Sequence, residues 1–473
     1  MKHKTRFLSI LVVYIILISM SIYASILCIE DQYAPYGYEM LFMLPLSFLC
    51  SIFLFFFGML KNKSPLENIP CVLLVLLTFI RNVLTPIVMV KDSYVSSLGI
   101  ANSDGASLAI WLVTYETIIL FLFVYIAEKY RFKQKGVGLL LKCRLPIGNS
   151  NTVLFRNAVI FFSSIAVISL LLVPSLRNSF YTIFTSGFTA PFQDNYLSRG
   201  DILTRALETG GNMAIAAVRY ILPCILFYKL ANKGEKLGNL IVSIAVVLAQ
   251  CLFMNDSNAY ILMLIFSQMF FILELYPKYR KGMIGGIAIV LISFSLMMYF
   301  NRFALDHYSK SLSLWLQSYF PGIANTAGIV NLSPQQNILQ IFEDIWVAIP
   351  FKAFLGYSGA ATSVAQKWII VNNCKGQILS TIGQSFYYFG FFLSPLISCC
   401  LLQISRKCQQ HVNGVDSALM RAAYIYFMIY SAATPFVYNF SIYAHAFLQR
   451  TIFIFVLAYF SPYSMSALEK SRQ

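Results

Sequence analysis

The chain has little charge and few residues suited to metal or redox chemistry. Only 11% of its 473 residues are charged, against roughly 25% in a typical soluble domain. The 4 histidines and 10 cysteines form neither a zinc-type spacing nor a CxxC pair. The sequence also has no glycine-rich phosphate loop and no Ser/His/Asp order of a hydrolase. We therefore expect neither a metal ion nor a cofactor.

Apolar residues dominate the sequence instead. Hydrophobic residues make up 58% of the chain and the mean hydropathy is +0.70. A transmembrane helix needs about 20 mostly apolar residues, and the sequence contains about twelve such runs. The predicted spans are 7–28, 40–60, 69–90, 107–127, 155–174, 213–230, 238–255, 259–275, 283–300, 384–404, 419–437 and 447–463. They predict an all-α polytopic membrane protein that forms a single integral domain over residues 1–473 of the chain, embedded in a lipid bilayer. The first run resembles a signal peptide, but no small-residue cleavage site precedes Glu30, so we interpret it as an uncleaved helix.

Basic residues predict the orientation of these helices. The net charge is +16, which in a soluble protein would raise nucleic acid as a partner. Here the lysines and arginines cluster in alternate connections, around residues 2–6, 61–63, 129–144, 229–236, 278–281, 406–407 and 470–472. Cytoplasmic connections carry this excess of positive charge. We therefore expect both termini in the cytoplasm, and no nucleic acid as a partner.

Two connections on the opposite side are unusually long, at residues 175–212 and 301–383. Loops of this length are usually functional or disordered. The second contains three of the 4 tryptophans, Trp315, Trp346 and Trp368, a composition that argues against disorder. Apolar residues at helical spacing over 338–354 predict a helix along the outer interface. We expect the two loops to cover a cavity.

Arginines are concentrated in the outer half of the predicted bundle. They are Arg81, Arg177, Arg199, Arg205, Arg219, Arg302 and Arg450. An ionised side chain at the bilayer centre costs at least ~2.5 kcal/mol, so it needs a partner or a function. The planar guanidinium group fits phosphate oxygens. A structural interpretation stays open, because Arg81 and Glu116 lie at similar depth in antiparallel helices and can pair, and arginines at the interface can reach lipid headgroups.

Several acidic residues and histidines on the outer side are candidates for acid–base chemistry. We favour His307, Glu343 and Asp344 because they share the longest loop. A general base must reach the proton that it removes, and spacing alone does not select one residue. Further candidates on the same side are Asp194, Asp201, Glu208, Asp306 and His445.

Three local motifs accompany this organisation. Ten residues separate Arg199 from Gly210, Tyr319-Phe-Pro-Gly322-Ile-Ala-Asn325 lies in the second loop, and Gly383-Gln-Ser-Phe-Tyr387-Tyr-Phe-Gly390 opens the tenth predicted helix. In these motifs and in its topology the chain resembles the O-antigen polymerases of the Wzy type. One departure is that Ser313 stands where a second arginine–glycine motif, starting at Arg302, would have its glycine.

The resemblance implies a GT-C-like helical fold in the bacterial inner membrane and a glycosyltransferase activity. The enzyme would join undecaprenyl-diphosphate-linked oligosaccharide repeat units on the periplasmic side. A chain-length regulator protein would be its partner. The diphosphate would be the leaving group, and arginines would stabilise its developing charge. The implied ligands for diphosphate and sugar are Arg81, Arg199, Arg205, Arg219, Arg302, Arg450 and Tyr387.

Two other functions fit the same architecture. An O-antigen ligase would transfer finished polymer to the lipid A core, but His307-Tyr-Ser does not resemble the histidine motif of ligases. A flippase or transporter of lipid-linked oligosaccharide is the other alternative. The long outer loops and the lack of an internal repeat in the sequence argue against it.

Overall fold

The computed structural model describes residues 2–59, 68–96, 98, 103–131, 151–174, 176, 202–252, 258–280, 282–286, 311–332, 337–351, 363–374, 377–412 and 414–470. Within the described residues, helices account for 82% and no strand occurs. The prediction of an all-α protein is confirmed to that extent.

The first half of the chain forms long apolar helices. They are α1 (Lys2–Glu30), α2 (Met43–Met59), α3 (Ile69–Phe79), η2 (Ile80–Leu84), α4 (Thr85–Lys91), α5 (Ser103–Arg131), α6 (Thr152–Leu172), α8 (Ile202–Asn232), α9 (Leu237–Leu252) and α10 (Asn258–Leu275). Helix α8 begins at Ile202, so it includes the end of the loop predicted at 175–212. Most of the predicted span 283–300 lies outside the described residues.

The second half alternates short helices with longer ones. They are η4 (Pro277–Tyr279), α12 (Leu312–Tyr319), α13 (Ile323–Ala327), η6 (Gly328–Asn331), α14 (Gln340–Ala348), α15 (Val364–Asn372), α16 (Thr381–Phe389), α17 (Leu396–Val412), α18 (Ala418–Val437), α19 (Phe440–Ala446), η8 (Phe447–Thr451), α20 (Ile452–Tyr459) and α21 (Met465–Lys470). The helix predicted within 338–354 is present as α14. The predicted span 384–404 is not one helix, because α16 ends at Gly390, whose φ of +76° belongs to a conformation that glycine adopts easily.

Six helical segments among the described residues are long and apolar enough to cross a membrane. They are Leu11–Glu30, Ile69–Lys91, Gly105–Ala127, Thr152–Leu172, Ala206–Asn232 and Phe440–Tyr459. Shorter apolar helices occur at Met43–Phe53, Leu237–Gln250 and Tyr260–Leu275. The chain is thus a helical membrane protein by length and composition, and twelve spans stay a prediction.

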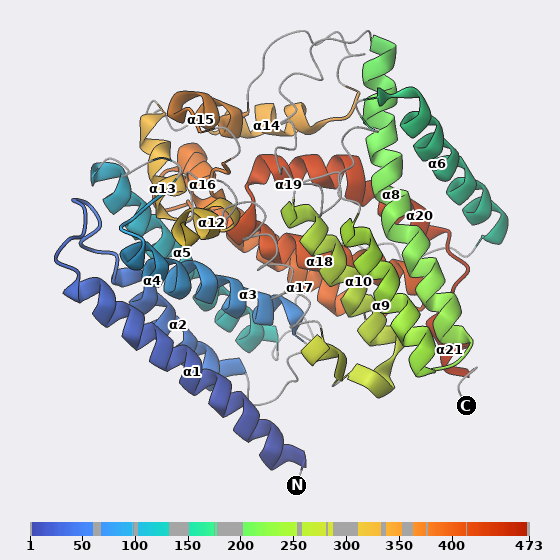
Figure 1. Ribbon diagram of the computed structural model, residues 1–473, viewed down its shortest axis with the longest axis horizontal. Coiled ribbons are helices and arrows are strands. Elements are labelled where there is room, and N and C mark those ends of the chain that lie inside the picture. The colour runs from blue at the N-terminus through green and yellow to red at the C-terminus, as the bar shows by residue number, and fades with distance from the viewer. Residues whose placement is uncertain are drawn as a thin grey trace.

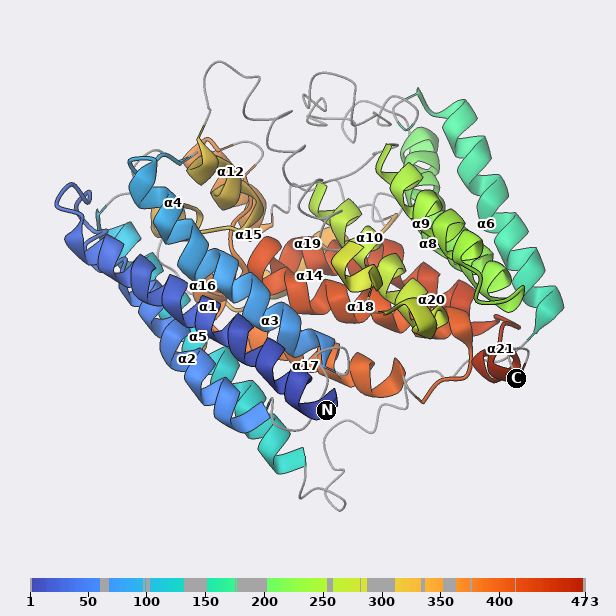
Figure 2. The ribbon, with the colours of Figure 1, turned by 60° about the horizontal axis from the view of Figure 1, so that its bottom comes forward.

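Helix α18 is the central element of the fold. Nearly all of its side chains are buried, as expected of a helix that packs on every side. It contacts α3, α10, α17 and α20. Figures 1 and 2 show α1 to α5 on one side of this centre and α6, α8 and α9 on the other.

Two segments have π-helical geometry, and each contains an arginine of the predicted set. Arg81 lies in η2 and Arg450 in η8. A π-helix inserts an extra residue into a helical turn and is found frequently at functional positions. These arginines are therefore held by irregular backbone within the spans Ile69–Lys91 and Phe440–Tyr459.

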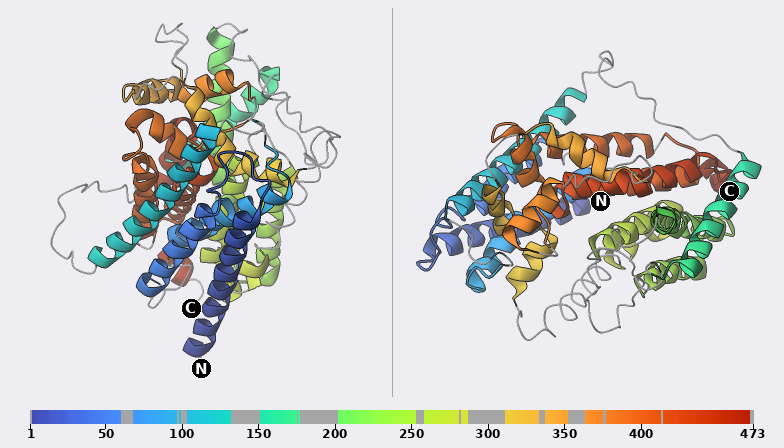
Figure 3. Two further views of the ribbon diagram at one scale, coloured as in Figure 1. Left: turned by 90° about the vertical axis from the view of Figure 1, so that its left-hand side faces the viewer. Right: turned by 90° about the horizontal axis from the view of Figure 1, so that it is seen from above.

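The described parts of the second predicted loop form a group of short helices, α12 to α15 with η6. Figure 1 shows α14 and α15 at the top of the view and both chain ends at the bottom, and the left panel of Figure 3 agrees. Helix α14 packs on α19, and α13 packs on α5. The described parts of the loop predicted at 301–383 thus include α14 and α15 at the end opposite the termini.

Candidate functional site

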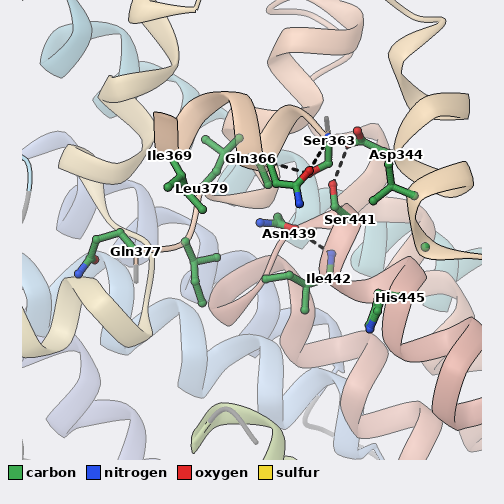
Figure 4. A pocket seen from close by; sticks show the side chains of 14 residues that line it. Asp344, Ser363, Gln366, Ile369, Gln377, Leu379, Asn439, Ser441, Ile442 and His445 are labelled. Atoms are coloured by element: carbon green, nitrogen blue, oxygen red, sulfur yellow. Dashed lines mark hydrogen bonds between the residues drawn. The ribbon is translucent and has the colours of Figure 1, made fainter. Parts of the chain in front are cut away.

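A cavity of about 270 Å³ lies where α14, α15 and α19 meet the segment that precedes α16. Apolar side chains such as Val347, Ile369 and Ile442 form part of its wall. Its polar lining residues are Asp344, Ser363, Gln366, Gln377, Asn439, Ser441 and His445. Figure 4 shows Gln377 at one end of this group and His445 at the other.

Local capping interactions explain why the two helices begin at the cavity. The Ser363 hydroxyl accepts a hydrogen bond from the backbone N–H of Gln366, whose side chain accepts one from the Ser363 N–H. This capping box starts α15. Asn439 caps α19 with its side-chain oxygen, which accepts a 2.9 Å hydrogen bond from the Ile442 N–H. Ser441 and His445 lie four residues apart on α19, so they share one face of it.

Asp344 is the most constrained polar group of the site. Asp344 is only 1% exposed. Oδ1 accepts from the Val364 N–H at 3.0 Å, and Oδ2 accepts from Gln384 Nε2 at 2.5 Å, from Ser441 Oγ at 2.7 Å and from the Tyr388 hydroxyl. We call these five residues the Asp344 network.

No lysine or arginine forms an ion pair with Asp344 within the described ranges. Burial of an unpaired charge is costly, and hydrogen bonds to a carboxylate are stronger than those between neutral groups. Four donors therefore compensate for the missing cation. The result is a fixed negative charge at the wall of the cavity.

Gln384 connects the three helices that hold this charge. Its Nε2 donates to Asp344 on α14, and its Oε1 accepts from the backbone N–H groups of Phe440, at 2.7 Å, and Ser441, at 3.4 Å, at the start of α19. Gln384 itself belongs to α16 and is fully buried. Both ends of its amide are thus used to set the position of α14 relative to α19.

Among the favoured acid–base candidates, Glu343 lies outside this arrangement. It is exposed, accepts from Gln340 Nε2 at 2.6 Å and lies 3.8 Å from Lys367 Nζ. Adjacent helical residues project about 100° apart, which explains why Glu343 faces solvent while Asp344 faces the cavity. His307 lies outside the described residues.

His445 lines the cavity and is exposed. Its Nδ1 lies 3.2 Å from Gln449 Nε2, which also donates to the Ala348 carbonyl. This contact holds the ring against α14 and orients it.

Arg81 has the structural partner that its depth in the helix allowed. Its Nη2 lies 2.8 Å from Glu116 Oε2, and both side chains are almost completely buried. The guanidinium group also lies 4.8 Å from the centre of the Phe436 ring. Ser398 donates to the other Glu116 oxygen at 2.5 Å. Arg81 does not line the cavity.

The other described arginines of the predicted set have different surroundings. Arg219 donates to the Gln250 carbonyl at 2.7 Å, and the Arg450 guanidinium lies 4.1 Å above the Tyr260 ring. Neither residue lines the cavity. Arg199, Arg302 and the side chain of Arg205 lie outside what the structure describes. None of the three arginines that it does describe lines this cavity, and their role as phosphate ligands stays a prediction.

Tyr387 is not part of the Asp344 network, whereas its neighbour Tyr388 is, and a role of Tyr387 in binding substrate stays a prediction. Tyr387 is half-buried, and its carbonyl accepts from the Asn337 N–H at 3.4 Å. Tyr388 instead contacts the carboxylate of Asp344. Gln384 and Tyr388 are four residues apart, and this spacing was the available signal for a shared face. Ser441 carried no such signal, because it comes from a distant segment.

Comparison with known proteins adds no relative: no family model matches the chain, and no curated protein or solved structure matches it at a significant level.

Proposed function

We propose that this protein is a glycosyltransferase that polymerises undecaprenyl-diphosphate-linked oligosaccharide repeat units. It would act on the periplasmic side of the bacterial inner membrane and produce O-antigen or a related surface polysaccharide. The observation that carries the proposal is the buried Asp344 carboxylate beside a polar cavity, at the end of the molecule opposite both termini. The sequence resemblance supplies the substrate class.

The reaction breaks the bond between the sugar C1 and the diphosphate oxygen and forms a bond between C1 and an acceptor hydroxyl oxygen. The diphosphate leaves with the bonding electrons, and the acceptor hydroxyl loses its proton. Glycosyl transfer of this kind passes through a positively charged, oxocarbenium-like transition state. A negative charge fixed before the reaction stabilises such a state, and the Asp344 network provides one.

The proton of the acceptor hydroxyl needs a base with access to the cavity. Asp344 is surrounded by donors, so we assign it electrostatic stabilisation rather than proton transfer. His445 is exposed in the same cavity, and histidine is the side chain best suited to proton transfer near neutral pH. We assign His445 the role of general base.

The diphosphate is expected outside the cavity. No lysine or arginine occurs among the described residues that line it. The ligands of the diphosphate are then arginines of the outer loops, with Arg199, Arg205 and Arg302 as the candidates.

Deletion of the gene, followed by gel analysis of lipopolysaccharide, tests this function. Loss of a polymerase leaves core capped with a single repeat unit. Bare core with polymer retained on the carrier lipid would instead identify a ligase, and bare core with repeat units trapped inside would identify a flippase. Either of those results, or an unchanged ladder, would refute the polymerase proposal.

Complementation with variants then tests the site. Asp344→Asn and His445→Ala are expected to leave single repeat units, while Glu343→Gln, a change at the exposed neighbour, restores the ladder. Membrane fractionation controls for insertion. Full ladders from both site variants would refute the assignment of this cavity to the reaction.

A further inference from the structure

The cavity carries a charge preference that the proposed function does not specify. We propose that it binds an uncharged or amino sugar of the repeat unit and excludes sugars that carry a carboxylate, such as uronic acids. The inference rests on the proposed function for its sugar ligand, and on the charges around the cavity for its selectivity.

The described lining contains a single carboxylate, Asp344, and no lysine or arginine. The remaining polar groups are neutral amides and hydroxyls together with His445. A second carboxylate held about 6 Å from Asp344, at an effective dielectric constant of about 20, would bind roughly a hundredfold more weakly than its neutral counterpart. An ammonium group would be attracted instead.

The size and walls of the cavity fit a single ring better than a whole repeat unit. Its volume of about 270 Å³ is just below the roughly 300–1,000 Å³ typical of small-molecule sites. Ile369, Leu379 and Ile442 provide apolar surface for the C–H face of a sugar. Gln366, Gln377 and Asn439 provide amide groups that can bond its hydroxyls.

Calorimetric titration of the detergent-purified full chain tests this selectivity. The probes are N-acetylglucosamine, glucosamine and glucuronate, which are neutral, cationic and anionic. The first two are expected to bind, and glucuronate to bind roughly a hundredfold more weakly than N-acetylglucosamine. Equal affinities for all three sugars, or binding by none of them, would overturn the proposal.

Charge variants locate the effect without disturbing the Asp344 network. Ala365 lines the cavity from α15 and is half-buried. Ala365→Lys is expected to increase glucuronate affinity by about tenfold or more, because an ammonium group would offset the negative charge of the wall. Ile370→Lys adds the same charge at an exposed position of α15 that does not line the cavity. In this variant the preference for N-acetylglucosamine over glucuronate should remain. Equal changes in both variants would contradict a local origin.

This measurement needs no donor lipid, so its outcome is separable from that of the gene deletion. Charge-ordered binding together with an unchanged lipopolysaccharide ladder would support the sugar site and refute the polymerase. Equal affinities together with single capped units would refute only the selectivity.

Discussion

Removing one member of the Arg81–Glu116 ion pair is expected to destabilise the protein far more than removing both. The joined atoms lie 2.8 Å apart, and the side chains are 1% and 0% exposed. At an effective dielectric constant of about 20, two unit charges at this distance attract by about 6 kcal/mol. Desolvation of each ion costs several kcal/mol, so attraction and desolvation nearly cancel while the pair is intact.

The single variants Arg81→Met and Glu116→Gln each leave one buried charge without its partner. Each is expected to lower the free energy of unfolding by about 3–5 kcal/mol. Glutamine keeps an acceptor for the Ser398 hydroxyl, so the second variant changes mainly the charge. The double variant should be less destabilised than either single variant, so the coupling energy should exceed the cost of one single change, about 3–5 kcal/mol.

Reversible unfolding in mixed detergent micelles, followed by tryptophan fluorescence, measures all four proteins of this cycle. Additive effects of the two single changes would refute the reasoning, because independent side chains show no coupling. The lipopolysaccharide ladder of the double variant then tests the role of Arg81. A stable double variant that still polymerises assigns Arg81 to structure, and a stable but inactive one assigns it to the substrate.

Three further predictions concern the site and its support. Tyr388→Phe removes one hydrogen-bond donor from the buried carboxylate and should lower the free energy of unfolding by about 1.5–3 kcal/mol. The control Tyr387→Phe should change this free energy by less than about 0.5 kcal/mol. Chemical denaturation measures both variants. Gly211→Ala would place Cβ 2.5 Å from a side-chain carbon of α6 and should cost about 1–3 kcal/mol by overpacking. Gly210→Ala meets its nearest atom at 3.7 Å and serves as the control, so equal melting temperatures would contradict the close approach of α6 and α8. His445→Ala should lower the polymerisation rate about 10²–10⁴-fold without loss of membrane-inserted protein, as measured by ladder length over time and by fractionation.

The pattern of apolar residues predicted most helices, because a helix that is buried in a membrane or in the protein core needs apolar residues along its whole length. It failed at Gly390, where a single backbone angle ends α16 although the hydropathy continues into α17. Glycine is compatible with a helix as well as with its end, so the residue type does not decide between them. Depth along antiparallel helices, in contrast, was enough to match Arg81 with Glu116.

The site was only partly accessible to sequence reasoning. Asp344 was selected because it is a carboxylate in the longest outer loop, but Gln384 and Ser441 lie 40 and 97 residues further along the chain. Packing of three separate helices brings them together, and no local pattern encodes that packing. The motif that contains Tyr387 gave no sign that Tyr388 contacts Asp344, because a motif gives positions in the sequence and not the rotation of the helix.

The π-helical turn η8 has a consequence for the helix that contains His445. Because consecutive α-helical residues are about 100° apart, the surplus residue of η8 changes the angular phase between α19 and α20. That offset lets His445 meet the cavity while Ile454 and Leu457 remain in the core. Deletion of Leu448 would restore a regular helix. Either His445 or the pair Ile454 and Leu457 would then turn away from its contacts. This deletion would therefore disable the protein although every functional side chain was retained.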